Sequence, residues 1–448
     1  MASLWFTEAL LPTGWAKGVR ARIEGSRFAS VETGVAPAPG DARHGPAVPG
    51  LANVHSHAFQ RGMAGLAETA GPADDDFWSW RETMYRFVLT LDPDQIEALA
   101  ALAFAEMAEA GFTTVGEFHY LHHAPDGAPY ANPAELAERI AAAAATAGIG
   151  LTLLPVFYAH GNFGAAAPSP RQARFLTTLD SYGALLDGCR AAIAPLEDAR
   201  LGVAPHSLRA ATLEEVRAVA GLADGGPVHI HAAEQTREVE DSIAQFGAPP
   251  VEVLLDRIGL GERWCLIHAT HLTGSETRRL AASGAVAGLC PVTESNLGDG
   301  VFPAPAYLDA GGRIAIGTDS NVLISAAQEL RALEYNQRLV RRARNVLAPP
   351  HGSTGRRLFD AAFAGGNRAL GLDRRGIAPG CLADLVTLDA DDPALILARG
   401  DGLLDAWIFA GAGIDGVWRA GRRIVAEGRH VGRQAIRTRY AQALARLL

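Results

Sequence analysis

Two histidines separated by one residue close a short apolar stretch near residue 50. The segment Pro49 to Gly65, PGLANVHSHAFQRGMAG, places His55 and His57 directly after an apolar run at 51–54. In a β-strand, residues i and i+2 point to the same side, so the two imidazoles would project together. Two convergent imidazoles suit a borderline divalent ion such as zinc. The alternative is a pair of solvent-exposed histidines in a turn, so groups further along the chain must decide.

Further groups able to bind a metal or move protons follow other apolar runs. The stretch VHIHAAE contains His229, His231 and Glu234, LIH ends in His268, and IGTDS contains Asp319. In a parallel barrel the carboxyl ends of all strands meet at one face, where catalytic side chains gather. A single histidine is more often structural than a ligand, but four such strand ends together indicate a metal site. His229 shares the side of His231 one layer deeper, and we interpret it as barrel packing.

Eight apolar runs, each typical of a β-strand, alternate with helical stretches over residues 49–375. This order predicts an α/β fold, a (β/α)8 TIM-like barrel. A doubly wound open sheet is the competitor, but no GxGxxG phosphate loop follows an early strand. The expected strands are 51–54, Thr113–Phe118, Leu151–Phe157, Leu201–Ala204, Val228–Ile230, Cys265–Ile267, Val286–Leu289 and Ile314–Ile316.

The two chain ends differ from this pattern. Residues 1–48 contain short strands and turns, and after residue 376 strands joined by glycine turns lead to a helix at Gln434–Leu448. We expect residues 1–48 and 376–448 to build a second, small β-sandwich domain beside the barrel. Within the barrel, a polar loop GPADDDFWSW precedes a helix expected around Arg81–Leu89.

Composition narrows the function classes. The 448 residues carry 40 basic and 49 acidic side chains, a net charge of −9, and no basic run that would indicate nucleic-acid binding. Four scattered cysteines argue against disulfides and a cysteine-zinc site. The uncharged run Ile140–Ala159 is long enough for a membrane span but contains glycines and a proline, which favours a helix end, a stop and a buried strand. With no signal-peptide pattern at the start, we expect a cytoplasmic protein without membrane or nucleic-acid partners.

The sequence resembles the amidohydrolase superfamily of metal hydrolases over nearly its whole length. The resemblance includes the opening PGLANVHSHAFQRG and the passage GIAPGCLADLVTLD near the end. Within the superfamily it is most similar to the formimidoylglutamate deiminase family of histidine degradation. That similarity implies hydrolysis of N-formimino-L-glutamate to N-formyl-L-glutamate and ammonia. The stretches that carry it are HSHAFQRGMAG, FWSWRETMY, GEFHYLHH, APHSLRA, HIHAAEQ, HATHL and CPVTESNLGDGVFPA.

The resemblance implies one divalent metal ion per chain, with Zn²⁺ the expected ion, held by His55, His57, His231 and Asp319. No lysine stands near the end of the fourth strand, where Ala204-Pro205-His206 lies, so a carbamylated lysine bridging two metals is not expected. This argues for a mononuclear site. Imidazole and carboxylate accept several divalent metals, so the ligand types alone do not choose among zinc, iron and manganese.

The same resemblance implies the catalytic roles. Asp319 would take a proton from the water that a bound divalent ion activates. His268 would orient the resulting hydroxide and stabilise developing charge, and Glu234 would shuttle protons so that the amine leaves as ammonia. The alternative for Glu234 is a solvated carboxylate at the start of a helix.

Substrate recognition rests on two arginines, since guanidinium groups bind carboxylates bidentately and the implied substrate carries two carboxylates. Arg81 in WSWRE and Arg209 in HSLRA match the family's carboxylate binders; the alternative for each is a structural or surface arginine. Polar groups implied around the same substrate are Gln60, Tyr120 and His206. Histidines 119, 122 and 123 are interpreted as loop residues rather than a second metal site. The segment ESNLGDG, 294–300, contains no obvious catalytic pair and is interpreted as an active-site loop with a glycine turn. Trp78 and Trp80 form either a lid or loop packing.

Two other functions compete with this one. A deaminase of the same superfamily acting on a nucleobase or triazine ring would need stacking and amide recognition more than two arginines. A binding or assembly protein on the same fold would have a degraded site, whereas the set of six catalytic and metal residues is complete here. A homodimer is expected only from the family resemblance.

Overall fold

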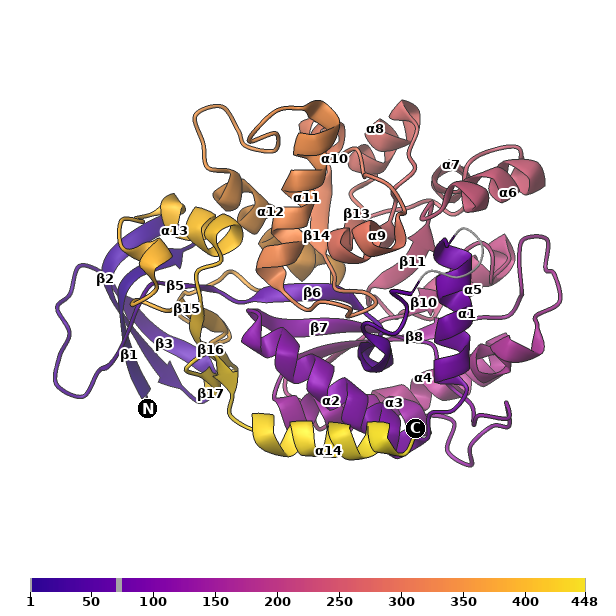
Figure 1. The fold of residues 1–448 in the computed structure, drawn as a ribbon, viewed down its shortest axis with the longest axis horizontal. Helices are drawn as coiled ribbons and strands as arrows, with labels where there is room; N and C mark the ends of the chain where they lie inside the picture. The colour runs from indigo at the N-terminus through magenta and orange to yellow at the C-terminus, as the bar shows by residue number, and fades with distance from the viewer. Residues whose placement is uncertain (1, 70–74, 448) are drawn as a thin grey trace.

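The computed structural model describes residues 2–69 and 75–447, and its central feature is a set of parallel strands (Figure 1). One sheet has the order β10-β8-β7-β6, with β9 paired to β8, and a second has the order β11-β12-β13-β14. All pairs in both sheets are parallel. The strands are β6 (Leu51–Ser56), β7 (Phe112–His119), β8 (Gly150–Phe157), β9 (Arg200–Leu201), β10 (Ala204–Pro205), β11 (Val228–Ala232), β12 (Trp264–His268), β13 (Val286–Leu289) and β14 (Arg313–Ile316).

Two isolated parallel bridges connect the edges of these two sheets. Val203, between β9 and β10, pairs with Val228 of β11, and Ser56 of β6 pairs with Asp319 just after β14. Each of the eight expected strand regions is present, with β9 and β10 together forming the fourth. Every residue of β6, β7 and β8 is buried, as expected for parallel strands covered by helices.

Helices lie between the strands and cover them on the outside; in Figure 1, α2 and α3 lie beside β7 and β8, and α11 and α12 lie beside β14. The helices are α1 (Phe77–Val88), α2 (Pro93–Glu109), α3 (Glu135–Ala147), α4 (Leu179–Ile193), α5 (Leu213–Gly221), α6 (Thr236–Phe246), α7 (Pro250–Arg257), α8 (Gly274–Ser283), α9 (Pro291–Leu297), α10 (Ala304–Asp309), α11 (Ala326–Arg341), α12 (Thr354–Ala369), α13 (Asp401–Asp405), α14 (Arg433–Ala445), the 3₁₀ turns η1 (Ala58–Met63), η2 (Pro170–Phe175) and η3 (Pro393–Leu395), and the π-turn η4 (Ala406–Ala410).

The long uncharged run Ile140–Ala159 is divided as expected. Helix α3 ends at Ala147, and Gly148 adopts a left-handed conformation (φ 67°) that reverses the chain into β8. Among the described residues, no helix combines the length and the apolar character needed to cross a membrane.

Helix α1 begins earlier than the sequence suggested. Asp76 caps it by accepting hydrogen bonds from the backbone N–H groups of Trp78 and Ser79, so the helix starts at Phe77 and not near Arg81. Trp78 and Trp80 therefore lie on a helix, whereas a loop was expected. The start of that expected loop, 71–74, lies outside the described residues.

Strands from both chain ends pair in one nine-stranded sheet with the order β18-β17-β16-β15-β5-β1-β2-β3, to which β4 is added on β1. The antiparallel pair β5–β15 joins the N-terminal strands to the C-terminal ones. The pairing gives one continuous sheet, and its arrangement as a β-sandwich stays a prediction. The strands are β1 (Ala2–Leu11), β2 (Gly14–Glu24), β3 (Arg27–Glu32), β4 (Ala42–His44), β5 (Ala47–Pro49), β15 (Leu385–Leu388), β16 (Ile414–Arg419), β17 (Arg422–Ala426) and β18 (Arg429–His430).

This sheet has an apolar cluster separate from the main core, which includes Phe6, Val19, Phe28 and Trp418. The expected C-terminal helix is α14, although Leu448 lies outside the described residues. It lies along α2 (Figure 1), where Gln95 donates a hydrogen bond to the carbonyl of Ala443 at 3.2 Å.

Candidate active site

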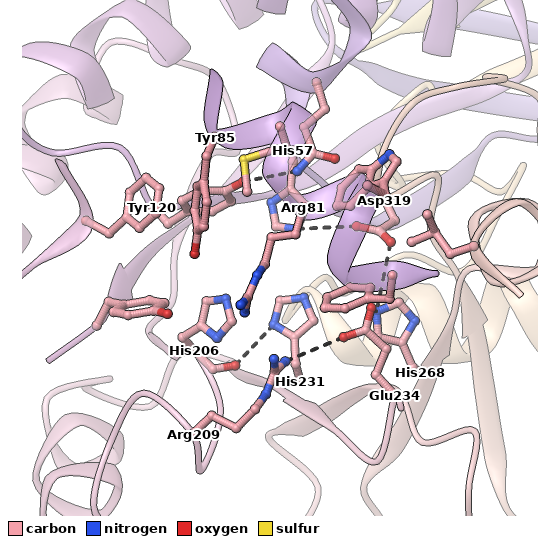
Figure 2. A pocket seen from close by; sticks show the side chains of 17 residues that line it. His57, Arg81, Tyr85, Tyr120, His206, Arg209, His231, Glu234, His268 and Asp319 are labelled. Atoms are coloured by element: carbon pink, nitrogen blue, oxygen red, sulfur yellow. Dashed lines mark hydrogen bonds and ion pairs between the residues drawn. The ribbon is translucent and has the colours of Figure 1, made fainter. Parts of the chain in front are cut away.

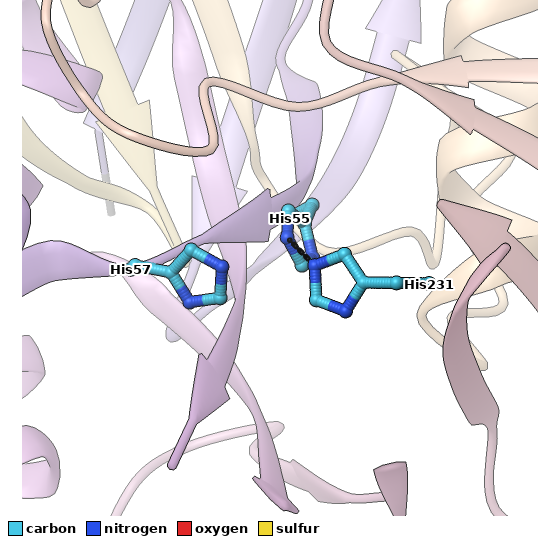
Figure 3. A group of neighbouring side chains, drawn as sticks. All are labelled: His55, His57 and His231. Carbon is cyan, nitrogen blue, oxygen red and sulfur yellow. Dashed lines mark hydrogen bonds between the residues drawn. The ribbon is translucent and has the colours of Figure 1, made fainter. Parts of the chain in front are cut away.

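Three histidine rings converge where β6 and β11 end (Figure 3). His55 is the last residue but one of β6, His57 directly follows that strand, and His231 is the last residue but one of β11. One ring nitrogen of each lies within 4.8 Å of the others, and the Nε2 atoms of His55 and His231 are 3.1 Å apart. All three side chains are buried.

Hydrogen bonds to backbone carbonyls orient two of these rings. The Nδ1 atom of His57 lies 3.0 Å from the carbonyl oxygen of Phe118, and that of His231 lies 3.1 Å from the carbonyl oxygen of His206. A carbonyl only accepts, so each Nδ1 carries the proton and each Nε2 keeps its lone pair. Burial lowers the pKa of all three rings, that of His55 to about 3, so they are neutral at neutral pH.

Asp319 adds a carboxylate to the three imidazoles. Its Oδ1 atom lies 3.4 Å from Nε2 of His55 and 3.3 Å from Nε2 of His57. Burial acts to raise its pKa, but the hydrogen bond with His55 and the neighbouring rings hold the pKa of Asp319 well below its usual range. Three neutral imidazole nitrogens and one ionised carboxylate form a donor set that fits a divalent ion such as zinc.

A buried polar network holds Asp319 in place. Its backbone is left-handed (φ 46°), an unfavourable conformation for a residue other than glycine. Asn321 donates hydrogen bonds to the carbonyls of Asp319 and His57, both at 3.1 Å, and accepts one from the hydroxyl of Thr318 at 2.6 Å. Asn53 donates to that same hydroxyl at 2.7 Å. The carboxylate therefore sits on a backbone tied to β6.

His268, at the end of β12, lies between three carboxylates. Its Nδ1 atom is 3.3 Å from Oε1 of Glu294, and its Nε2 atom is 3.6 Å from Glu234 and 3.9 Å from Asp319. Burial lowers the pKa of His268, but these carboxylates outweigh it and raise the pKa to about 10. The ring is therefore protonated at neutral pH and can stabilise negative charge.

The segment 294–300 contributes more than the sequence suggested. It was interpreted as a loop without a catalytic pair, but Glu294 belongs to α9 and contacts His268. Asp299 forms a buried group with Glu234 and His268, and burial together with the charge of Glu234 raises the pKa of Asp299 to about 9. The direction of a side chain on a short helix after a strand cannot be derived from spacing, which is why Glu294 was missed.

Glu234 connects His268 to the arginine side of the site. Its second carboxylate oxygen lies 3.6 Å from Arg209, and its burial raises its pKa. A raised pKa is the direction expected of a carboxyl group that acts as a general acid.

A single cavity opens above these groups (Figure 2). It is lined by ten of the eleven predicted site residues; His55 lies beneath it, fully buried. Trp80 lines it and Trp78 does not. Further lining residues that the sequence analysis did not single out are Phe77, Met84, Tyr85, Tyr158, Phe175 and Leu297. Of these, Tyr158 directly follows the third strand region, so the strand-end rule could have found it.

Arg81 and Arg209 reach into this cavity from opposite sides (Figure 2). The guanidinium of Arg81 lies 4.4 Å from the ring centre of Trp78. That of Arg209 lies 3.9 Å from Glu238 as well as close to Glu234. The Nε atoms of both arginines are buried without a hydrogen-bond partner among the described residues, so each has donor capacity left for a ligand. Next to them, Gln60 donates a hydrogen bond to the hydroxyl of Tyr120 at 3.0 Å.

The other histidines lie outside this donor set. Nε2 of His229 lies 2.7 Å from the carbonyl oxygen of Ala369, and the side chain is buried. Nε2 of His122 lies 2.8 Å from the carbonyl oxygen of Val156, and Nε2 of His123 lies 2.8 Å from that of Leu176. Among the described residues, none of these three rings belongs to a group of potential metal ligands.

Comparison with known proteins identifies the family of this chain. Residues 47–424 match the amidohydrolase family, and residues 1–45 match the N-terminal domain of formimidoylglutamate deiminase HutF. The chain is 49% identical to formimidoylglutamate deiminase of Pseudomonas aeruginosa over the full length of both.

Solved structures give the same result. An amidohydrolase from Brucella melitensis superposes with a TM-score of 0.97 at 55% identity, covering all of both chains. An adenosine deaminase from Xanthomonas campestris with bound zinc shares the fold, with a TM-score of 0.81 at 23% identity over 100% of this chain and 98% of that one. The chain therefore belongs to the amidohydrolase family and is a relative of the formimidoylglutamate deiminases.

Proposed function

We propose that the chain is a metal-dependent iminohydrolase that converts N-formimino-L-glutamate and water to N-formyl-L-glutamate and ammonia in histidine degradation. One observation carries the proposal: two arginines with unused donors face each other across the cavity that also contains the imidazole and carboxylate groups. The full-length identity to a formimidoylglutamate deiminase supports it.

The ligands of the ion would be His55, His57, His231 and Asp319, one ion per chain, with zinc the expected ion. When bound, the ion supplies Lewis acidity that brings the pKa of a water toward neutrality. The protein contributes the orientation of the ligands, since carbonyl oxygens of Phe118 and His206 fix two of the rings.

The chain's own groups move the protons. Asp319, which is ionised, accepts a proton as the water oxygen adds to the formimino carbon. The protonated His268 stabilises the charge that develops in the resulting tetrahedral species. Glu234 donates a proton to the departing nitrogen; as the C–N bond breaks, the hydroxyl proton of the tetrahedral species returns to Glu234, the formyl carbonyl forms, and the ammonia leaves with the proton held by Asp319 as ammonium.

Arg81 and Arg209 would bind the two carboxylates of the substrate, and Gln60, Tyr120 and His206 would complete the polar wall around it. Charge-assisted bonds from guanidinium to carboxylate favour an acyclic diacid over a nucleobase or triazine ring. The partner expected is therefore a small dicarboxylate.

The architecture proposed for this enzyme is a (β/α)8 barrel, 49–375, beside a small β-sandwich domain, 1–48 and 376–448. The two bridges between the parallel sheets support the barrel, and the separate apolar cluster of the nine-stranded sheet supports a second domain. A homodimer and a cytoplasmic location stay predictions.

The test is ammonia release by the purified, zinc-loaded protein from N-formimino-L-glutamate, with cytosine and guanine assayed alongside. We expect release from the formimino compound alone. Arg209→Ala should lower kcat/KM by about 10- to 100-fold, because a charge-assisted hydrogen-bond pair to a carboxylate is lost.

Arg217→Ala is the matched control, because Arg217 is an exposed arginine on α5 that donates to the carbonyl of Arg257. Its kcat/KM should equal that of the wild type. Ammonia release from a ring base, or equal kcat/KM for Arg209→Ala and wild type, would contradict the proposal.

A further inference from the structure

Tyr158 lines the cavity but has no role in the scheme above. It directly follows β8, at the same end of the strands as the histidines, and is 8% exposed. Arg81 and Arg209 line the same cavity. A tyrosine placed between two guanidinium groups can add a neutral donor to a site for an anion.

The hydroxyl oxygen of Tyr158 accepts a hydrogen bond and therefore has its proton left to donate. Nε2 of Gln172 lies 2.6 Å from that oxygen, and Oε1 of Gln172 accepts from the backbone N–H of Ser169 at 2.7 Å. The second bond fixes which end of the amide faces the tyrosine, and an amide nitrogen cannot accept. Among the described residues, the hydroxyl of Tyr158 accepts this bond from Gln172 and donates none.

The position of Tyr158 is fixed before any ligand binds. Its backbone exchanges hydrogen bonds with Thr177, whose hydroxyl accepts from its N–H at 3.2 Å and whose N–H donates to its carbonyl at 2.8 Å. Its ring packs against His206, with 4.8 Å between ring centres, and against Phe175, with 5.8 Å. A donor whose side chain is already fixed by such contacts can bind a ligand without the entropy cost of ordering that side chain.

The charge around this hydroxyl favours an anionic acceptor. Burial raises the pKa of Tyr158, so the group keeps its proton, while the charges of Arg209 and Arg81 act on the same hydroxyl. An oxygen that accepts from Tyr158 would therefore also lie near two guanidinium groups. A carboxylate fits, because it can accept several hydrogen bonds and carries the opposite charge.

We propose that Tyr158 is a specificity-determining residue whose hydroxyl donates a hydrogen bond to the γ-carboxylate of the glutamate-derived substrate. This inference rests on the proposed function. The α-carboxylate of the substrate is next to the reacting group, so we assign it to the polar residues beside the histidines. One of these is Tyr120, whose ring centre is 5.0 Å from that of His57. The ring of Tyr158 packs against His206, which itself stacks on His231 with 4.8 Å between ring centres, so Tyr158 lies one side chain further from the converging histidines, on the side assigned to the γ-carboxylate.

The test is calorimetric binding of three formyl compounds to zinc-loaded wild type and Tyr158→Phe, which removes only the hydroxyl. N-formyl-L-glutamate carries both carboxylates, 4-formamidobutanoate lacks the α-carboxylate, and (S)-2-formamidobutanoate lacks the γ-carboxylate. We expect the Kd of the first two to rise about 10- to 100-fold in the variant, as for a lost hydrogen bond to a charged group, and the Kd of the third to stay unchanged. With N-formimino-L-glutamate, KM should rise while kcat stays within about threefold.

Tyr182→Phe is the control, because its buried hydroxyl donates to the carbonyl of Pro155 at 2.7 Å outside the cavity. It should leave all three Kd values unchanged. Equal weakening of all three ligands in Tyr158→Phe, or no weakening, would overturn the inference, as would a wild type that binds none of them. Ammonia release by the wild type is scored separately, so failure of the proposed reaction is distinguishable from failure of the role of Tyr158.

Discussion

Two groups of three histidines lie near the carboxyl ends of the parallel strands, and only one suits a metal. The converging group is His55, His57 and His231. The flanking group is His119, His122 and His123, at the end of β7 and just beyond it. Both groups are buried or nearly so, and burial lowers the pKa of His55 to about 3 and that of His122 to about 4.

The difference lies in which ring nitrogen faces a carbonyl. His57 and His231 bond carbonyl oxygens through Nδ1 and leave Nε2 for the centre, next to Asp319. His122 and His123 bond carbonyl oxygens through Nε2, in different directions. A metal site is therefore defined by the direction of lone pairs and a nearby carboxylate, and the number of histidines is a poor guide.

The largest effect is expected from breaking the converging group. His231→Ala removes one of four donors, so bound zinc should fall from about one ion per chain to a small fraction and turnover should fall by about 10³-fold or more. Metal analysis and ammonia release measure both. His123→Ala, in the flanking group, should keep the ion; equal metal loss in the two variants would show that the groups are not distinct.

A smaller effect is expected from changing Glu294, the carboxylate that contacts Nδ1 of His268. Glu294→Gln keeps the size of the group that holds His268 but removes its charge, so kcat should fall about 10- to 100-fold while the bound ion is retained. Glu276→Gln is the control, because that buried glutamate accepts from the backbone N–H groups of Thr273 and Glu252 away from the cavity. An unchanged kcat in Glu294→Gln would contradict a positioning role.

The smallest effect is expected from changing His122 in the flanking group, and it concerns only the free energy of unfolding. His122 has a folded pKa of about 4, below the ordinary 6.5, so between these values the unfolded chain binds a proton that the folded chain does not. Wild-type stability should therefore fall as pH drops from 6.5 toward 4, and His122→Gln should lack this component. Melting curves of both proteins at pH 7 and pH 5 test this. At pH 7 the free energy of unfolding of the variant should be lower than that of the wild type by about 1 kcal/mol, and this difference between the two proteins should be smaller at pH 5. Turnover at pH 7 should not change.

The fold was predictable where burial is uniform. Parallel strands covered on both sides appear as continuous apolar runs, and all eight expected regions contain strands. The start of α1 was not predictable, because three consecutive aspartates precede it and only the hydrogen bonds of Asp76 identify the cap. Strand pairing between residues far apart was equally out of reach, so the nine-stranded sheet was expected only as a joint β domain of both chain ends.

The site was predictable where it follows strand ends. The rule that such residues gather at one face brings His57, His231, His268 and Asp319 to one cavity, as the structure has them. Glu294 and Asp299 were missed because one lies on the short helix α9 and the other just after it, and the direction of this helix depends on tertiary packing. The bonds of Nδ1 atoms to carbonyls were also unpredictable, because backbone acceptors carry no side-chain signature.

The network that joins Asn53 to Thr318 has a consequence for folding. These two residues are separated by 265 positions in the chain and exchange two hydrogen bonds next to Asp319. Bringing the two residues together costs the conformational entropy of closing a loop of that length, and the contact stabilises the fold only after the loop has closed. Such non-local contacts form slowly during folding. The proposed ion should therefore bind only chains in which β6 and the segment after β14 have already met, so metal uptake during refolding would measure the closure of this contact.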